Sequence, residues 1–259
     1  MNKMGVQMRV SVLRMRLAIL LVIGAIAVST IANYTINAAL QGDPQRDAQE
    51  VAAAVGELNE LAGKDAIKIE APSEIENINI SSANLLLILL PVLAIILPLR
   101  TFRTMLNFGD SRGRYFIGLL LIYAAAALVL ALCNSLWWPF EQGVIREHSQ
   151  TINLIEVFGW DRMGIIGAFL YQAAFYFFVL SLFNLLFSRM KSPVTWILWA
   201  VLIAAIPIGT SIASLRVHVA DFFLALLFND SLLAGMGLNL ALSAVFIAGA
   251  WLFTRHRTI

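Results

Sequence analysis

The sequence predicts an all-α integral membrane protein with six transmembrane helices, a cytoplasmic N-terminal interfacial helix and a re-entrant outer hairpin before the last span. Three observations lead to this fold class. The 259 residues are 60% hydrophobic and only 13% charged, whereas soluble domains carry about 25% charged residues. Six stretches reach the roughly 20 apolar residues that a helix needs to cross a bilayer. Basic residues gather at alternating ends of these stretches, as membrane topology requires.

The N-terminal segment, residues 1–16, mixes apolar residues with Lys3, Arg9, Arg14 and Arg16. This mixture is typical of an amphipathic helix on a membrane surface, where apolar side chains reach the acyl region and basic side chains meet anionic headgroups. We therefore expect an interfacial helix on the cytoplasmic side.

The six expected spans have no Asp, Glu, Lys or Arg in their central parts. They cover residues 17–39, 80–99, 115–136, 163–187, 194–215 and 232–253. Helices are expected because each one satisfies its own backbone hydrogen bonds in lipid. The runs also lack the alternation of apolar and polar residues that a membrane barrel requires.

The charge distribution predicts the orientation. With both termini in the cytoplasm, the inner segments hold 12 of the 18 Lys and Arg residues, and their one acidic residue is Asp110. The other 15 acidic residues fall on the outer side. Cytoplasmic loops normally carry the excess of basic residues. We therefore expect a multi-pass protein of the plasma membrane with cytoplasmic N- and C-termini.

The first outer loop, residues 41–79, is long and acidic and is expected to form a small extracellular cap. Asp43 and Pro44 are typical of a helix start. Apolar residues then recur every three or four positions, and alternation at 67–70 and 77–80 favours short strands. The alternative is a gate or a surface that gathers substrate.

The hairpin is expected between the fifth and sixth spans. Residues 219–228 are apolar except for Asp221 and are too few to cross a bilayer. Counting them as a seventh span would place Arg255 and Arg257 on the outer side. Residues 229–231 then favour a turn and a helix N-cap, so this segment is expected to dip into the outer leaflet and return.

Motifs for catalysis and metal binding are absent from the sequence. It contains no phosphate-binding G-x-x-x-x-G-K-[ST], no H-E-x-x-H and no G-x-S-x-G. A single cysteine, Cys133, excludes a disulfide framework and a cysteine-based zinc site. We expect no catalytic residue, no metal, no cofactor and no nucleic-acid partner for this chain.

Uncharged polar residues lie within the spans. Asparagine and glutamine in such positions are typical of interhelical hydrogen bonds. The functional alternative is a substrate pathway formed by Asn33, Asn134, Gln172, Tyr176 and Asn184. No ionisable residue lies at mid-depth, which argues against a carrier coupled to protons or sodium.

The inner segment 100–115 is the best candidate for docking a partner that supplies energy. Its apolar residues stand among arginines, and apolar anchors within a charged rim are typical of a protein interface. The alternative is a basic turn that merely follows the charge rule. The expected docking residues are Phe102, Arg103, Met105, Phe108, Gly109, Arg112 and Arg114.

The run Phe108-Gly109-Asp110-Ser111-Arg112, followed by Tyr115-Phe116-Ile117-Gly118, resembles the permease subunits of type-2 ATP-binding-cassette (ABC) exporters. That family carries a similar phrase between its second and third spans, and its order of parts is similar over nearly the whole chain. The resemblance implies a single permease domain over 1–259 that pairs with a second permease copy, as a homodimer or a heterodimer. It also implies separate ABC ATPase subunits, which hold ATP and magnesium, and outward movement of a hydrophobic or amphipathic substrate such as a drug, lipid or peptide.

Two other function classes stay open. An intramembrane enzyme would need polar groups that converge at one depth, for which Gln172 with Asn184 or Asn134 is the best case. A sensory membrane protein would use the outer loop as its receptor.

Overall fold

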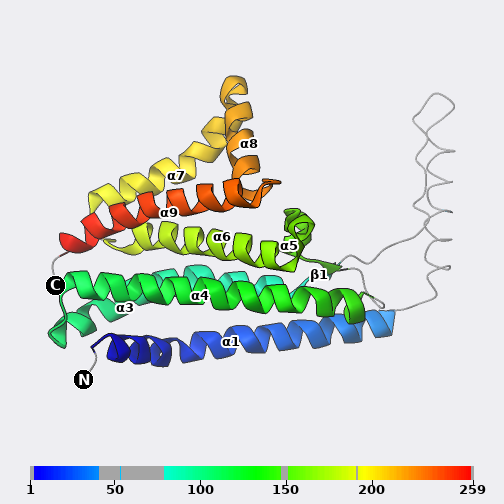
Figure 1. Ribbon diagram of the computed structural model, residues 1–259, viewed down its shortest axis with the longest axis horizontal. Helices are drawn as coiled ribbons and strands as arrows, with labels where there is room; N and C mark the ends of the chain where they lie inside the picture. Colours follow the sequence, from blue (N-terminus) through cyan, green and yellow to red (C-terminus); the bar gives the residue numbers. More distant parts are fainter. Residues whose placement is uncertain (1–2, 41–52, 54–78, 147–150, 191, 258–259) are drawn as a thin grey trace.

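The structure, a computed structural model, describes residues 3–40, 53, 79–146, 151–190 and 192–257. Long helices run back and forth along one direction, with α7 and α8 projecting from one side (Figure 1). The long helices are α1 (Lys3–Leu40), α3 (Leu89–Asn107), α4 (Arg112–Phe140), α6 (Gly164–Phe187), α7 (Pro193–Ser211) and α9 (Leu232–Arg255). The turn between α3 and α4 lies at the same end as both termini.

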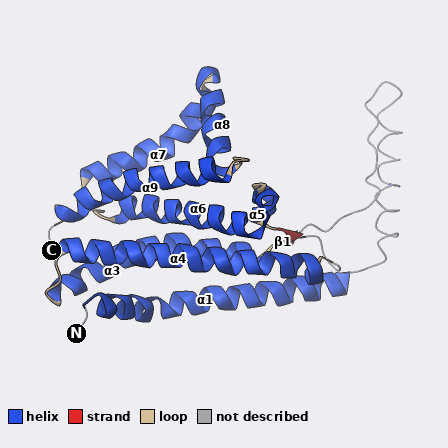
Figure 2. Ribbon diagram, in the orientation of Figure 1, coloured by secondary structure: helices blue, strands red, loops and turns tan. Residues whose placement is uncertain are grey.

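Short elements complete the described chain, and Figure 2 shows how little of it is not helical. They are β1 (Asn79–Ile80), η1 (Ser82–Ile88), η2 (Glu141–Ile145), β2 (Thr151–Ile152), α5 (Leu154–Val157), η3 (Trp160–Met163) and α8 (Ala213–Leu227).

Five helical segments are long and apolar enough to cross a membrane. They are Ser82–Asn107, Arg112–Ile145, Trp160–Phe187, Pro193–Ser211 and Leu232–Arg255. These segments correspond to five of the six predicted spans and confirm the class of all-α membrane protein. In α1, the apolar stretch Ile19–Ala32 is shorter.

Helix α1 is continuous, so no break separates the predicted interfacial segment from the predicted first span. Its N-terminal part already packs in the bundle, where Gln7 Nε2 donates to the carbonyl oxygen of Tyr115 at 3.0 Å. Gln7 and Ser11 are both buried. A Cβ on Gly118 would overlap the Gln7 side chain, so glycine permits this approach of α1 to α4. The end of the bundle that holds both termini therefore meets α1 near residue 7, about ten residues before the expected start of the span.

Helix α6 forms the centre of the fold, with α3, α4 and α9 packed around it. In the most apolar 18-residue stretch of Trp160–Phe187, the segment that contains α6, 56% is buried. The corresponding stretches of α7 and α9 are 11% and 17% buried. The largest core cluster joins α3, α4 and α6 through Leu97, Phe102, Tyr115, Tyr123 and Leu180. Among the five candidate spans, those of α7 and α9 therefore leave the largest share of their apolar residues uncovered.

Two short strands lie at the end of the bundle opposite the termini, and the alternation at 77–80 predicts the first of them, β1. Strand β1 pairs in parallel with β2, with Asn79 opposite Thr151. Ser81 N then donates to Ile152 O at 3.0 Å. The expected strand at 67–70 and nearly all of the expected cap at 41–79 lie outside the described residues.

The segment before the last span forms one helix, α8, which Figure 1 shows lying across the direction of α9. It begins at Ala213, six residues before the predicted apolar stretch, because α7 ends at Ser211 rather than at residue 215. Asn229 Oδ1 accepts from Ser231 N at 2.9 Å, and the Ser231 side chain caps α9. The predicted turn and N-cap are therefore confirmed.

Candidate functional site

The turn between α3 and α4 is short and tightly closed. Gly109 has a φ of 72°, the left-handed conformation that glycine adopts at low cost. Gly109 N donates to Leu106 O at 2.9 Å, and Asp110 N donates to Met105 O at 3.1 Å. These two bonds form a Schellman motif, which satisfies carbonyls at the end of α3. Ser111 then caps α4 by accepting from Arg114 N at 3.2 Å.

Two of the predicted docking residues, Phe102 and Met105, are buried rather than exposed. Helix α3 continues past Arg100 to Asn107, so these side chains turn inward one helical turn apart. Phe102 meets the Tyr115 ring edge-on at 5.3 Å. Sequence reasoning ended the span at the first arginine and therefore placed both residues in a loop. They support the turn from inside.

The other predicted docking residues lie on the surface of the turn. Phe108 is 64% exposed, which is unusual for a phenylalanine because burial normally stabilises it. Arg103, Gly109, Arg112 and Arg114 are also exposed. Arg114 lies 3.6 Å from the carboxylate of the buried Asp110. An exposed aromatic side chain and three exposed arginines thus lie in and beside the turn, at the end of the bundle that holds both termini.

The end of α9 is tied to this turn. Arg112 Nη1 donates to Arg255 O at 2.6 Å, and Arg257 Nη1 donates to Pro98 O at 2.8 Å. The Arg257 guanidinium also lies 4.4 Å from the centre of the Phe102 ring. Burial, and to a lesser degree the nearby charge of Arg103, lowers the pKa of Arg257. These contacts join the end of α9 to α3 and to the start of α4.

Three residues of the predicted substrate pathway come together in the interior. Gln172 Nε2 donates to Tyr176 Oη at 2.7 Å, and the Asn134 amide lies close to the same hydroxyl. All three side chains are buried. Among the described residues, Asn134 Nδ2 and Gln172 Oε1 have no hydrogen-bond partner. Polar groups from α4 and α6 thus converge at one depth.

Asn184 lies apart from this group, in a second buried cluster. Tyr123 Oη donates to Asn184 Oδ1 at 3.4 Å, and Ser188 Oγ lies 3.5 Å from the same oxygen. The side chain of Asn33 lies outside what the structure describes. The structure therefore brings three of the five pathway residues together, and the pathway itself stays a prediction.

A buried carboxylate, that of Glu141, lies at the end of the bundle opposite the termini and was not predicted from the sequence. Glu141 is 1% exposed and its Oε2 accepts from Ser81 Oγ at 2.7 Å and from Asn153 Nδ2 at 3.1 Å. Asn153 Nδ2 also lies 3.2 Å from Asn134 Oδ1. The sequence offered one signal for it, the position of Glu141 directly after the apolar residues 136–140.

Glu156 is the shared acceptor of a second polar group at the same end of the bundle. Its Oε1 accepts from Trp138 Nε1 at 2.9 Å and from Gln142 Nε2 at 3.0 Å, and its Oε2 pairs with Arg146. Burial raises the pKa of Glu156, but these hydrogen bonds and the charge of Arg146 outweigh it, so the pKa lies below its usual value of 4.5. The group ties α5 to the end of α4.

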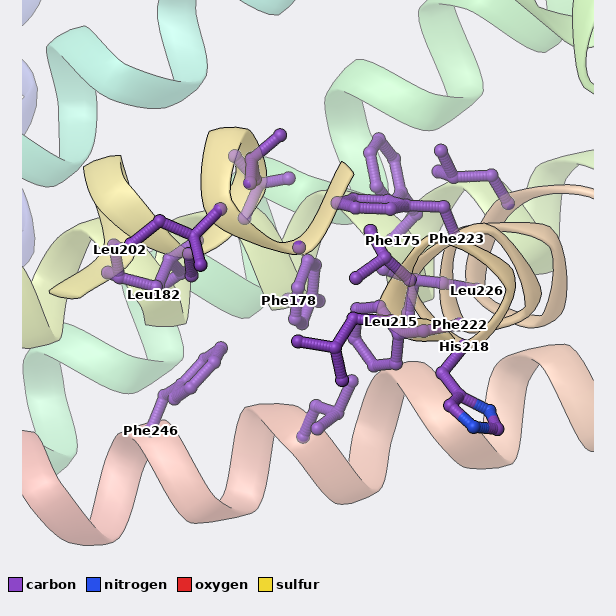
Figure 3. A pocket seen from close by; sticks show the side chains of 18 residues that line it. Phe175, Phe178, Leu182, Leu202, Leu215, His218, Phe222, Phe223, Leu226 and Phe246 are labelled. Atoms are coloured by element: carbon purple, nitrogen blue, oxygen red, sulfur yellow. The ribbon is translucent and has the colours of Figure 1, made fainter. Parts of the chain in front are cut away.

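Two apolar cavities lie among the described helices. The larger, of about 770 Å³, is bounded by α6, α7, α8 and α9 (Figure 3). The smaller, of about 290 Å³, lies between α4, α6 and α9 and is lined by alanine, leucine, phenylalanine and methionine. None of the predicted pathway residues lines either cavity.

In the part of the chain that the structure describes, no group of three or more His, Cys, Asp and Glu side chains could hold a metal ion. No family model, curated protein or solved structure matches the chain.

Proposed function

We propose that this chain is the transmembrane permease subunit of an ATP-driven ABC exporter in the plasma membrane, with six spans and both termini in the cytoplasm. The observation that carries the proposal is the exposed Phe108, which stands among Arg103, Arg112 and Arg114 on a closed turn. Aromatic and arginine side chains are the residues most often found to dominate binding energy at protein interfaces. The chain supplies no nucleotide-binding motif of its own, so the ATPase is a separate partner.

The side chains packed beneath the turn between α3 and α4 suit this turn to transmit force to the helices. Phe102 and Tyr115 lie beneath it and belong to the same core cluster as Leu180 of α6. Packed interiors transmit strain because they have low compressibility. In our proposal, ATP-driven closure of two ATPase subunits displaces two such turns, one from each permease copy. Each turn then moves α3, α4 and α6 together.

The substrate is a hydrophobic or amphipathic molecule that is released outward. Asn134, Gln172, Tyr176 and Asn184 are buried within the single chain, so a route along them, with Asn33 from α1, requires α4 and α6 to part during transport. Helix α8, close to the outer end, enters the outer leaflet in this proposal.

An affinity-tagged chain tests the docking surface. We expect the double variant Phe108→Ala with Arg112→Ala to reduce co-purification of an ATPase at least tenfold, because loss of one dominant interface residue costs about 2 kcal/mol. Phe140→Ala with Arg162→Ala removes the same residue types at the opposite end and is the matched control. Phe102 is left intact because its removal would disturb the core. Equal co-purification with both variants would refute the docking role.

The second candidate is an intramembrane enzyme, which the convergence of Asn134, Gln172 and Tyr176 favours. A substrate there would contact amide and phenol groups shielded from water. Chemical turnover by the purified chain, without nucleotide or partner, would select this candidate. Turnover that depends on ATP and a second subunit would select the exporter.

A further inference from the structure

The buried carboxylate of Glu141 has no opposite charge beside it. It lies within the candidate span Arg112–Ile145, and no ion pair among the described residues includes it. The nearest basic residue along the chain, Arg146, pairs with Glu156 instead. A buried charge without a partner is costly, so an ionisable residue within a membrane span is a candidate functional group.

Three oxygen atoms from separate segments surround one point beside this carboxylate. The nitrogen Nδ2 of Asn153 occupies the point. It lies 3.1 Å from Glu141 Oε2, 3.2 Å from Asn134 Oδ1 and 3.3 Å from Ser81 Oγ. All four residues are buried. We call the three oxygens of Ser81, Asn134 and Glu141 the oxygen cradle.

The cradle is positioned by contacts that do not involve the Asn153 side chain. Asn134 and Glu141 are seven residues apart on the helix that continues from α4 into η2, a spacing of two turns that places both on one face. Ser81 is held next to them because its backbone N donates to Ile152 O at 3.0 Å. The three oxygens can therefore keep their places if Asn153 turns away.

The number of donors at the centre of the cradle is one too small. Asn153 Oδ1 accepts from Ile155 N at 3.0 Å, which fixes the amide so that its nitrogen faces the three oxygens. That nitrogen carries two hydrogens and no charge. A primary ammonium carries three hydrogens and a positive charge, so it matches both the three acceptors and the carboxylate of Glu141.

Other cations match the cradle less well. The distances of 3.1–3.3 Å from Asn153 Nδ2 are close to those of N–H···O hydrogen bonds, about 2.7–3.2 Å. Calcium binds oxygens at about 2.3–2.6 Å, which the cradle does not offer at its present size. A quaternary ammonium has no N–H group to donate.

The cradle shares one residue with the polar group in the interior. Asn134 gives its oxygen to the cradle, while its amide also lies close to the hydroxyl of Tyr176. That hydroxyl accepts from Gln172 Nε2 at 2.7 Å. The cradle is thus the continuation of the proposed substrate route toward the end of the bundle opposite the termini.

From these features, we propose that the oxygen cradle binds the primary ammonium group of an amphipathic substrate, which takes the place of Asn153 Nδ2. The ammonium supplies the charge that Glu141 lacks, and the Asn153 side chain turns away. This inference rests on the proposed function, because the parting of α4 and α6 during transport is what brings a substrate to these buried atoms. It narrows the substrate class to amphipathic amines.

The first test compares two ligands of equal charge and equal alkyl chain on the wild-type chain. Radiolabelled octylammonium and octyltrimethylammonium are bound to the full chain in phosphatidylcholine nanodiscs. We expect saturable binding of octylammonium. The affinity for octyltrimethylammonium should be at least tenfold lower, because its nitrogen cannot donate hydrogen bonds to the cradle.

Variants then test the residues of the cradle. Glu141→Gln keeps the shape of the side chain but removes its charge, and should lower the affinity for octylammonium at least tenfold. Asp230→Asn removes the charge of an exposed carboxylate and should leave the affinity unchanged. Asn153→Ser keeps an N-cap for α5 and removes the nitrogen at the centre of the cradle, so its affinity should be at least that of wild type.

Equal affinity of wild type and Glu141→Gln would overturn the proposal, as would equal affinity for the two ligands. Displacement of octylammonium by an equal concentration of potassium chloride would show a metal-ion site and would also overturn it. The ligand comparison needs no variant, so it decides the proposal if Glu141→Gln does not fold.

The binding measurements need no ATPase, so the two proposals can fail separately. Normal co-purification of an ATPase with a chain that shows no saturable octylammonium binding would overturn the ammonium site alone. Saturable binding, together with equal ATPase recovery by the docking variant and its control, would refute the docking role alone.

Discussion

The guanidinium of Arg257 lies over the ring of Phe102, 4.4 Å from its centre, and its Nη1 donates to Pro98 O at 2.8 Å. Residues more than 150 positions apart in the sequence thus meet at the end of the bundle that holds both termini. The contact closes α9 onto α3 beneath the exposed turn.

Removing this contact should lower stability. A cation–π interaction contributes roughly 0.5–2 kcal/mol, and 1 kcal/mol shifts the Tm of a protein of this size by about 2–4 °C. We expect Arg257→Ala to lower the Tm in detergent by about 2–6 °C. Arg255→Ala is the control, since its side chain is exposed and its carbonyl is retained. A Tm drop of the same size in both variants would contradict the specific role of Arg257.

The α6–α9 contact depends on a glycine. A Cβ on Gly235 would overlap the ring of Tyr171, whereas one on Gly237 would meet nothing within 4 Å. We expect Gly235→Ala to destabilise the protein by about 1–3 kcal/mol, the usual cost of overpacking. Gly237→Ala should be neutral or slightly stabilising, because alanine favours helix. Thermal unfolding of the two variants measures the difference, and equal behaviour would rule out close packing at Gly235.

The turn between α3 and α4 requires glycine at its left-handed position. Gly109→Ala should cost about 1–2 kcal/mol, since a Cβ is unfavourable at a φ of 72°. Gly113→Ala is the matched control in the first turn of α4, where a Cβ would lie 3.7 Å from Trp251, an ordinary contact. Unfolding of both variants in detergent should show a loss for Gly109→Ala only.

Acid should lower the stability of the protein through Glu156, at the end of the bundle opposite the termini. Its pKa is lowered in the folded protein, so its contribution to stability is complete above its usual value of 4.5 and is lost as the pH falls through the lower, folded value. The stability difference between wild type and Glu156→Gln should therefore shrink as the pH is lowered from 6 to about 3, followed by tryptophan fluorescence. Asp230→Asn breaks an exposed pair with Arg162 and should give a small difference at every pH.

Glu141 should stabilise the protein as the shared hydrogen-bond acceptor of Ser81 and Asn153. Glu141→Ala leaves Ser81 and Asn153 without their shared acceptor, and each unsatisfied buried group costs about 1–3 kcal/mol. Glu141→Gln keeps one acceptor oxygen and should retain part of the stability. Thermal unfolding of the pair distinguishes the two cases. If Glu141→Ala were as stable as wild type, the cluster would have no structural role.

The long helices could be predicted well from the sequence because the central parts of their apolar runs contain no charged residue. The expected ends of the third, fourth and sixth spans lie within four residues of the helical segments Arg112–Ile145, Trp160–Phe187 and Leu232–Arg255 at all but one boundary. At the second span, Arg100 and Arg103 made α3 seem to end at residue 99, whereas the helix continues to Asn107. The spacing of Leu97, Thr101 and Met105 continues one helical face, which was the available signal.

Contacts between distant segments could not be predicted in the same way. The pairing of β1 with β2 and the bonds from Ser81 and Asn153 to Glu141 join residues 60 or more positions apart, or across a turn. No local pattern encodes them. The larger cavity, between α6, α7, α8 and α9, likewise depends on where Trp160, Tyr171 and Asn239 meet the end of α8, which is a result of packing.

The carbonyl oxygen of Leu226 accepts one bond from α6 and another from α9. A shift of either helix along its axis by one residue, about 1.5 Å, would stretch one bond while the other held. The hydrogen bonding of this carbonyl thus depends on the relative position of α6 and α9. An isotope label on the Leu226 carbonyl would report a shift between the two helices as a change in its infrared stretching frequency.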